Sequence, residues 1–223
     1  MTPHEPAGAE AADLPLEIVH AVKAGLQATR PRPVILAGGI AAGKTRTAER
    51  VVRQLRDQGL SVGGILAPRR VEGGATVGYR VVDLALGEER AFAESTPPGR
   101  PVGRFYVRPE ALRFAHAAVH RAVTTCDVVF IDEVGRWELD GGGHADSVRE
   151  LVASNAAAVL LVREAFVDDV IAAFGLRDAE VFHVAPPPPK RATGSLADAF
   201  WSMIDGIPFP LFVTVGEDGF PES

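Results

Sequence analysis

A glycine loop set between an apolar run and a helix-forming run constrains this chain more than any other feature. Residues 38–45 read Gly-Gly-Ile-Ala-Ala-Gly-Lys-Thr and match the pattern G-x-x-x-x-G-K-[ST]. The apolar run 33–37 precedes the loop, and residues 46–55 follow it with the composition of a helix. Gly38 and Gly43 let the backbone turn its N–H groups toward an anion, since a Cβ atom at either position would obstruct the turn. The spacing predicts a strand, a phosphate-binding loop and a helix in succession.

The side chains that end the loop have the chemistry that a polyphosphate requires. Lys44 can reach the β- and γ-phosphates, and Thr45 can offer its hydroxyl group to Mg²⁺. The helix that begins near Lys44 adds unpaired N–H groups and the positive end of its dipole. We expect the nucleotide-binding residues to be Gly38, Gly39, Ile40, Ala41, Ala42, Gly43, Lys44, Thr45 and Arg46.

A second apolar run, residues 128–131, leads directly into Asp132 and Glu133. Continuous apolar runs are typical of buried parallel strands, and a carboxylate after such a strand can orient Mg²⁺. Neighbouring side chains in a strand point to opposite faces, but a chain that turns at the end of the strand can present both. We therefore assign the metal to Asp132 and the attacking water to Glu133, the general base. Gly38 and Asp132 both follow strands, so they can share one crevice at the carboxyl edge of the sheet.

Three further residues near this crevice are candidates for the site. Arg136 follows the acidic pair, and Arg163 follows a predicted core strand. An arginine at either place can compensate charge on the transferred phosphoryl group, or it can form an ordinary surface ion pair. Trp137 can stack on a base or pack in the interior.

Strands alternate with helices along most of the chain, which predicts an α/β fold with a mostly parallel sheet covered on both faces. Residues 61–107 are mainly strand-like and predict an antiparallel addition, in which 97–101 form a loop and 102–107 a strand. The expected organisation is a disordered tail at 1–13, a helical extension at 14–32, the main domain at 33–185, and a proline-rich linker with a short helix (195–204) and tail at 186–223.

Composition narrows the classes of partner. The net charge of −6 and the lack of a long Lys/Arg stripe argue against nucleic acid as the main partner. No basic and apolar leader and no run of about 18 apolar residues is present, so we expect no membrane partner. The one cysteine, Cys126, cannot form an internal disulfide, and we expect it to fill space at the foot of a strand in a cytoplasmic protein.

Taken together, these residues resemble the THEP1-type nucleoside-triphosphatases, a family of small P-loop NTPases. Four stretches carry the resemblance: residues 38–45, 63–66, 73–84 and 131–139. The last reads Ile-Asp-Glu-Val-Gly-Arg-Trp-Glu-Leu and is close to the family pattern I-D-E-[IV]-G-x-M-E-L, with Trp137 at the position of the usual Met. The resemblance covers about residues 33 to 185.

The resemblance implies a three-layer, RecA-like P-loop NTPase fold and slow hydrolysis of ATP, GTP and other nucleoside triphosphates to diphosphates. It also implies dependence on Mg²⁺ and broad base specificity. Carried over by position, Lys44 and Thr45 serve the phosphates and Mg²⁺, Asp132 the metal, and Glu133 the attacking water.

Two other functions remain open at this stage. In a nucleoside or nucleotide kinase, the basic residues of the helix predicted at 109–124 would hold an acceptor phosphate; they are Arg113, His116, His120 and Arg121. In a nucleotide-gated binding module, turnover would be negligible. The segments 14–32 and 186–223 would then engage a protein partner or a second copy of the chain.

Overall fold

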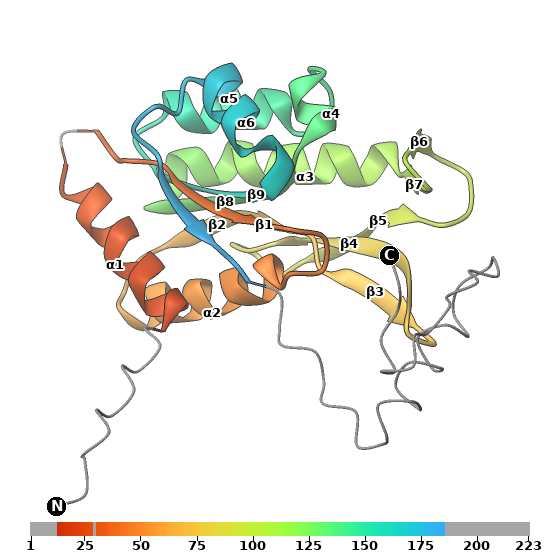
Figure 1. Ribbon diagram of the computed structural model, residues 1–223, viewed down its shortest axis with the longest axis horizontal. Coiled ribbons are helices and arrows are strands. Elements are labelled where there is room, and N and C mark those ends of the chain that lie inside the picture. The colour runs from red at the N-terminus through yellow and green to blue at the C-terminus, as the bar shows by residue number, and fades with distance from the viewer. Residues whose placement is uncertain (1–12, 29, 186–223) are drawn as a thin grey trace, which may run out of the picture. The chain divides into compact units, whose positions relative to one another are not determined.

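The strand predicted before the glycine loop is β1, which lies next to the edge strand β10 of a ten-stranded sheet, and the loop connects it to the helix α2 (Figure 1). The computed structural model describes residues 13–28 and 30–185, which fall within one compact unit. The strands follow the order β10-β1-β9-β8-β2-β4-β5-β7-β6, and β3 pairs with β4 outside this path. Their bounds are β1 Val34–Gly38, β2 Val62–Leu66, β3 Arg69–Glu72, β4 Ala75–Asp83, β5 Glu89–Glu94, β6 Arg100–Val102, β7 Phe105–Val107, β8 Val128–Val134, β9 Ala157–Arg163 and β10 Glu180–His183.

The sheet has a parallel half and an antiparallel half. The strands β10, β1, β9, β8 and β2 run parallel to one another. From β4 onward each strand is antiparallel to its neighbour. The fold class expected from the alternation of strands and helices, with its antiparallel addition, is therefore confirmed. Parallel strands place their carboxyl ends at one edge, where ligands of such sheets bind.

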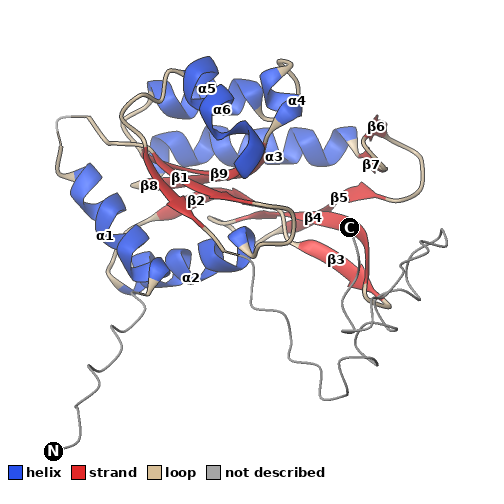
Figure 2. Cartoon of the chain, viewed as in Figure 1, coloured by secondary structure: helices blue, strands red, loops and turns tan. Residues whose placement is uncertain are grey.

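Helices cover both faces of the sheet (Figure 2). One face carries α1 and α2, and the other carries α3, α5 and α6. The helices are α1 Leu14–Leu26, α2 Lys44–Asp57, α3 Pro109–Thr125, α4 Arg136–Leu139, α5 Ala145–Ala153 and α6 Val167–Phe174, with a 3₁₀ turn, η1, at Glu164–Phe166.

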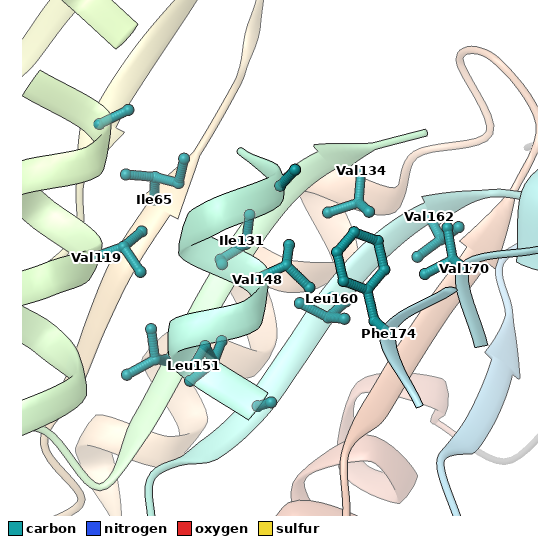
Figure 3. Packing of buried hydrophobic residues seen from close by; sticks show 14 of the residues in the cluster. Ile65, Val119, Ile131, Val134, Val148, Leu151, Leu160, Val162, Val170 and Phe174 are labelled. Carbon is teal, nitrogen blue, oxygen red and sulfur yellow. The ribbon is translucent and has the colours of Figure 1, made fainter. Parts of the chain in front are cut away.

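Alternation along the parallel strands divides the interior into two cores. Ile131 and Leu160 point toward α3, α5 and α6, where they meet Val148 and Phe174 (Figure 3). Phe130, their neighbour in β8, belongs to the opposite core with residues of α1 and α2. Strands buried on both faces need apolar side chains at every position, which is why the runs at 128–131 and 157–162 lack polar residues.

The helix α1 buries its apolar face in the same core as α2. Ile18, Val19 and Val22 are fully or almost fully buried. They pack in one cluster with Val51 and Leu55 of α2. The segment expected to lie outside the nucleotide-binding unit thus completes one covered face of the sheet.

Several short elements differ from the sequence-based expectation. The strand expected at 102–107 is a hairpin of β6 and β7, and β6 includes two residues that were expected to form a loop. The short strand β3 and the single-turn helix α4 were not expected. The helix expected at 195–204 lies outside the described residues. Within the part of the chain that the structure describes, no helix is both long and apolar enough to cross a membrane.

Candidate active site

The glycine loop curves between β1 and α2 as the sequence predicts. Gly43 precedes α2 with φ of 100°, and Ala41 adopts φ of 62°. Positive φ at Gly43 is cheap because glycine has no Cβ atom, whereas at Ala41 it stores strain. Lys44 Nζ donates hydrogen bonds to the carbonyl oxygens of Gly38 at 2.9 Å and Gly39 at 3.1 Å. The ammonium group is thus held over the loop, where it can meet a phosphate.

Burial affects the pKa of Lys44. Desolvation lowers the pKa of its ammonium group, and the nearby carboxylates of Glu133 and Asp132 act in the opposite direction. An ammonium group with few water neighbours interacts strongly with an anion that enters the loop.

Asp132 lies beneath the phosphate loop and is joined to it, so the structure brings together the two motifs that the sequence places at one edge of the sheet. Its Oδ2 atom accepts hydrogen bonds from Thr45 Oγ1 at 2.9 Å and from the Ala67 N–H at 3.0 Å. Its Oδ1 atom accepts one from the Glu133 N–H at 2.7 Å. The side chain is buried, and burial together with the negative charge of Glu133 raises the pKa of Asp132 to about 6.

A bulge in β8 presents both acidic residues. Ile131 pairs with Leu160 and Val134 with Val162, so two residues of β8 face one residue of β9. Glu133 occupies the bulge with φ of 59°, in the left-handed region that non-glycine residues avoid. The strand therefore does not end at the acidic pair, as expected, but bends there and continues to Val134. The bulge, and not a terminal turn, re-aims the Glu133 side chain.

The three candidate residues beyond the acidic pair have different surroundings. Arg163 pairs with Gly38 in the register of β9 and β1, and its Nη2 atom lies 3.6 Å from Glu133 Oε2. Arg136 is exposed at the start of α4 and pairs with Asp140 at 3.3 Å. Trp137 is half-buried under the guanidinium group of Arg100, which lies 5.3 Å from its ring centre. Only Arg163 is therefore in direct contact with an acidic residue of the crevice.

A cleft of about 1010 Å³ follows the loop. Residues 40–47 form its floor, so the predicted residues Ile40, Ala41, Ala42, Gly43, Lys44, Thr45 and Arg46 all line it. Glu133, Arg163 and Tyr79 also line the cleft, as does His183, the last residue of β10. This volume is enough for a nucleotide, since small-molecule sites run from about 300 to 1,000 Å³.

The oxygen atoms of Thr45 and Asp132 suit Mg²⁺. This ion prefers octahedral oxygen ligands at 2.0–2.1 Å, which places adjacent ligand atoms about 2.9 Å apart. The separation of Thr45 Oγ1 and Asp132 Oδ2 is 2.9 Å. Among the residues of the described ranges, no group of three His, Cys, Asp or Glu side chains could hold a metal by itself. The spacing of these two oxygen atoms therefore fits Mg²⁺.

Glu138 supports the site without lining the phosphate loop. Its carboxylate is buried and accepts hydrogen bonds from the Gly135 N–H at 2.9 Å and the His144 N–H at 3.0 Å. These bonds tie α4 and the turn at 141–143 to the end of β8, and Gly142 and Gly143 lack the Cβ atoms that would strike Trp137 and Glu138. The only sequence signal for this role was the second Glu of the stretch at 131–139.

Other residues of the site escaped the sequence analysis. Ala67 contributes only its backbone N–H, and no residue type signals such a contact. Tyr79 reaches the end of the phosphate cleft from β4, and its aromatic side chain within the stretch at 73–84 was the available signal.

The basic residues of α3 do not form the acceptor site considered for a kinase. Arg121 forms an ion pair with Asp83, and the imidazole of His116 bonds to the Gly143 carbonyl oxygen at 2.9 Å. His120 is exposed and contacts Glu150. None of these residues, nor Arg113, lines the phosphate cleft.

A parallel sheet with a glycine loop after β1 and a carboxylate in β8 that contacts the loop threonine defines a P-loop NTPase. The chain belongs to the NTPase family, whose sequence profile matches residues 33–190. A curated relative, "Nucleoside-triphosphatase THEP1" of Methanopyrus kandleri, is 37% identical over 134 residues, which are 60% of this chain and 74% of the relative. The resemblance inferred from the four sequence stretches is therefore confirmed.

Two solved structures share the fold. The crystal structure of THEP1 from the hyperthermophile Aquifex aeolicus matches with a TM-score of 0.57 and 23% identity, and the match covers 69% of this chain and 90% of that one. The solution structure of a human cancer-related nucleoside triphosphatase matches with a TM-score of 0.55 and 22% identity, over 78% and 97% of the two chains.

Proposed function

We propose that this protein is an Mg²⁺-dependent enzyme that hydrolyses ATP, GTP and other nucleoside triphosphates to diphosphate and phosphate. The observation that carries the proposal is the hydrogen bond between Thr45 and Asp132 at 2.9 Å, which joins the phosphate loop to the acidic strand. The family and the relatives named nucleoside-triphosphatase support the same reaction class.

In this mechanism the loop binds the triphosphate, Asp132 binds the metal ion, and Glu133 acts on the attacking water. Backbone N–H groups of the loop and the Lys44 ammonium group bind the phosphate oxygens. Bound through Thr45 and Asp132, Mg²⁺ would neutralise charge on the phosphates. Glu133 orients a water molecule and accepts its proton as the oxygen approaches the γ-phosphorus. Arg163, which lies 3.6 Å from Glu133, pairs with that carboxylate and holds it beside the phosphate.

Phosphate release from ATP and from GTP in the presence of Mg²⁺ tests the proposal. We expect Lys44→Ala to lower turnover by about a hundredfold or more, because it removes a cation aimed at the transferred group. Lys23→Ala is the matched control: Lys23 lies on α1, where it bonds to Gln58 at 2.7 Å, and this variant should retain wild-type turnover. Wild-type release no faster than that of Lys44→Ala, or release unaffected by EDTA, would contradict the proposal.

A further inference from the structure

A second cleft, of about 600 Å³, adjoins the phosphate cleft. The two clefts share four lining residues: Ile40, Tyr79, Glu133 and Arg163. Glu133, the proposed base, therefore stands at the boundary between them. A nucleophile that Glu133 deprotonates can approach the γ-phosphate from this second cleft.

Two arginines lie on the β6–β7 side of the second cleft, whereas its acidic residues, Glu133, Glu138 and Asp140, come from β8 and the segment that follows it. Arg100 and Arg104 extend from the β6–β7 hairpin and line the cleft. Arg100 lies over Trp137 at 5.3 Å, and Arg104 lies over Phe105 at 4.9 Å. Within the described ranges, neither guanidinium group pairs with a carboxylate, whereas Arg136 pairs with Asp140. Guanidinium groups held by aromatic rings and free of carboxylates favour binding of an anion.

Aromatic rings line the rest of the cleft together with charged side chains, and two buried nitrogen atoms, Trp137 Nε1 and His144 Nδ1, have no hydrogen-bond partner among the described residues. Tyr79 and Phe105 meet edge to face at 5.3 Å, and Phe92 stacks on His144 at 5.6 Å. His144 is 2% exposed. Aromatic walls favour a flat ligand, and a buried polar atom without a partner is costly unless a ligand or water satisfies it.

The size of the cleft argues against water as its sole occupant. A water molecule takes about 30 Å³ of liquid volume, whereas this cleft falls in the range of about 300 to 1,000 Å³ typical of sites for organic ligands.

We propose that this cleft, named here the acceptor cleft, binds a planar, anionic small molecule that carries a hydroxyl group, and that the protein transfers the γ-phosphoryl group to that hydroxyl. Arg100 and Arg104 bind the anionic group, and the aromatic side chains of the cleft contact the ring. The proton of the acceptor O–H passes to the Glu133 carboxylate while the acceptor oxygen bonds to the γ-phosphorus. The bond from the γ-phosphorus to the β–γ bridging oxygen breaks, and its electron pair leaves on the nucleoside diphosphate. The transfer rests on the proposed triphosphate site, whereas binding in the acceptor cleft does not.

Binding is tested with the full chain carrying Trp201→Phe, in which Trp137 is the only tryptophan. The probes are AMP, GMP, CMP and UMP, each of which has a planar ring, a phosphate and ribose hydroxyl groups. Saturating Mg²⁺ and ADP fill the phosphate loop, so a saturable change in Trp137 emission reports the acceptor cleft. We expect at least one probe to produce this change.

The variants decide where the probe binds. Arg100→Ala and Arg104→Ala, both at exposed positions, should each weaken probe binding about tenfold, the usual effect of losing a hydrogen bond to a charged group. Arg177→Ala is the matched control, because Arg177 is exposed before β10 at the opposite edge of the sheet and should leave binding unchanged. No saturable change with any probe, or equal binding by all three variants, would overturn the acceptor cleft.

Transfer is tested with ATP labelled in the γ-phosphate and the probe that binds. Label in a phosphoester on a ribose hydroxyl group of the probe supports the proposal, whereas label in a phosphoanhydride on its phosphate contradicts transfer to the hydroxyl. Label found solely in inorganic phosphate, with the probe bound, overturns phosphoryl transfer and leaves the proposed hydrolysis intact. Failure of the hydrolysis proposal is seen separately, as a lack of phosphate release in wild-type protein without any probe.

Discussion

Asp132 and Glu133 are adjacent in sequence but differ in surroundings, and hence in chemistry. Asp132 is 1% exposed and accepts three hydrogen bonds, so its carboxylate is fixed in orientation. The Glu133 side chain is 29% exposed, lies in a bulge and borders both clefts. A fixed carboxylate suits a metal, whereas a carboxylate open to solvent and ligand suits proton transfer. The surroundings thus favour the roles that we propose for the two residues.

Replacing Glu133 by Gln removes the proton acceptor while keeping the shape of the side chain. We expect turnover to fall on the order of a hundredfold or more, the scale of general-base catalysis, while Mg²⁺–nucleotide binding is retained. Single-turnover phosphate release and equilibrium binding of a labelled triphosphate separate the two effects. Glu164→Gln is the matched control, since Glu164 lies at the same edge of the sheet but pairs with His183 at 2.8 Å. A loss confined to binding would show that Glu133 is not the base.

At the scale of elements, the parallel half of the sheet could be predicted from the sequence and the short antiparallel elements could not. β1 and α2 lie where the sequence predicts a strand and a helix, because a continuous apolar run and a glycine loop mark them locally. β3 has exposed, charged side chains, so its pairing with β4 leaves no burial pattern in the sequence. In the β6–β7 hairpin, Gly103 and Arg104 turn a stretch that alternates like one strand.

The part of the candidate site formed by contiguous motifs could be predicted from the sequence, and the part formed by tertiary packing could not. The residues of the loop and of β8 are contiguous in sequence, so their motifs show them. Arg100, Arg104 and His144 meet Trp137 only through the packing of the hairpin against α4 and the turn after it, and no local spacing indicates such contacts. The bulge at Glu133 likewise depends on the register between β8 and β9.

The glycine pair in β2 has a physical role that the sequence resemblance alone did not explain. Gly64 has φ of 87°, and a Cβ atom there would strike the Phe130 carbonyl oxygen in β8. We expect Gly64→Ala to lower the free energy of unfolding by about 3 kcal/mol or more, because backbone must move to relieve the clash.

Gly87→Ala provides the matched control for this prediction. Gly87 has a similar φ of 71°, but nothing lies within 4 Å of the position of its Cβ atom. In the control, the free energy of unfolding should fall only by the cost of placing alanine in the left-handed region, about 1–2 kcal/mol. Urea denaturation of both variants measures the difference, and equal losses would show that the contact between β2 and β8 is not the cause.

At the scale of the whole molecule, buried titratable groups link stability to pH. The His144 ring packs against Phe92 of β5 and His116 of α3, and the backbone N–H of His144 donates a hydrogen bond to the Glu138 carboxylate of α4. Burial, with a smaller effect of His116, lowers the pKa of His144 to about 3. The unfolded chain therefore binds a proton between pH 6.5 and 3 that the folded chain does not. His144 thus contributes stability above pH 6.5 that is lost as the pH falls.

We expect this effect to reach about 2 kcal/mol at pH 5 relative to pH 8. Asp132, whose pKa is raised to about 6, acts in the opposite direction over part of this range, so the difference between wild type and His144→Gln isolates the imidazole. The gap between their unfolding free energies should change by that amount between pH 8 and 5, as measured by urea denaturation. His20→Gln, at an exposed position on α1, is the matched control. A constant gap would contradict the assignment.

The left-handed backbone at Ala41 and Glu133 has a consequence for any attempt to make this protein more heat-resistant. Glycine at either position would relieve conformational strain of about 1–3 kcal/mol, offset in part by the greater freedom of glycine in the unfolded chain. Both residues border the phosphate cleft. A selection for thermal tolerance would therefore favour glycine at two positions that border the phosphate cleft, where a change of backbone disturbs the site. Substitutions that raise the unfolding temperature without loss of turnover should be sought in the helices distant from this edge.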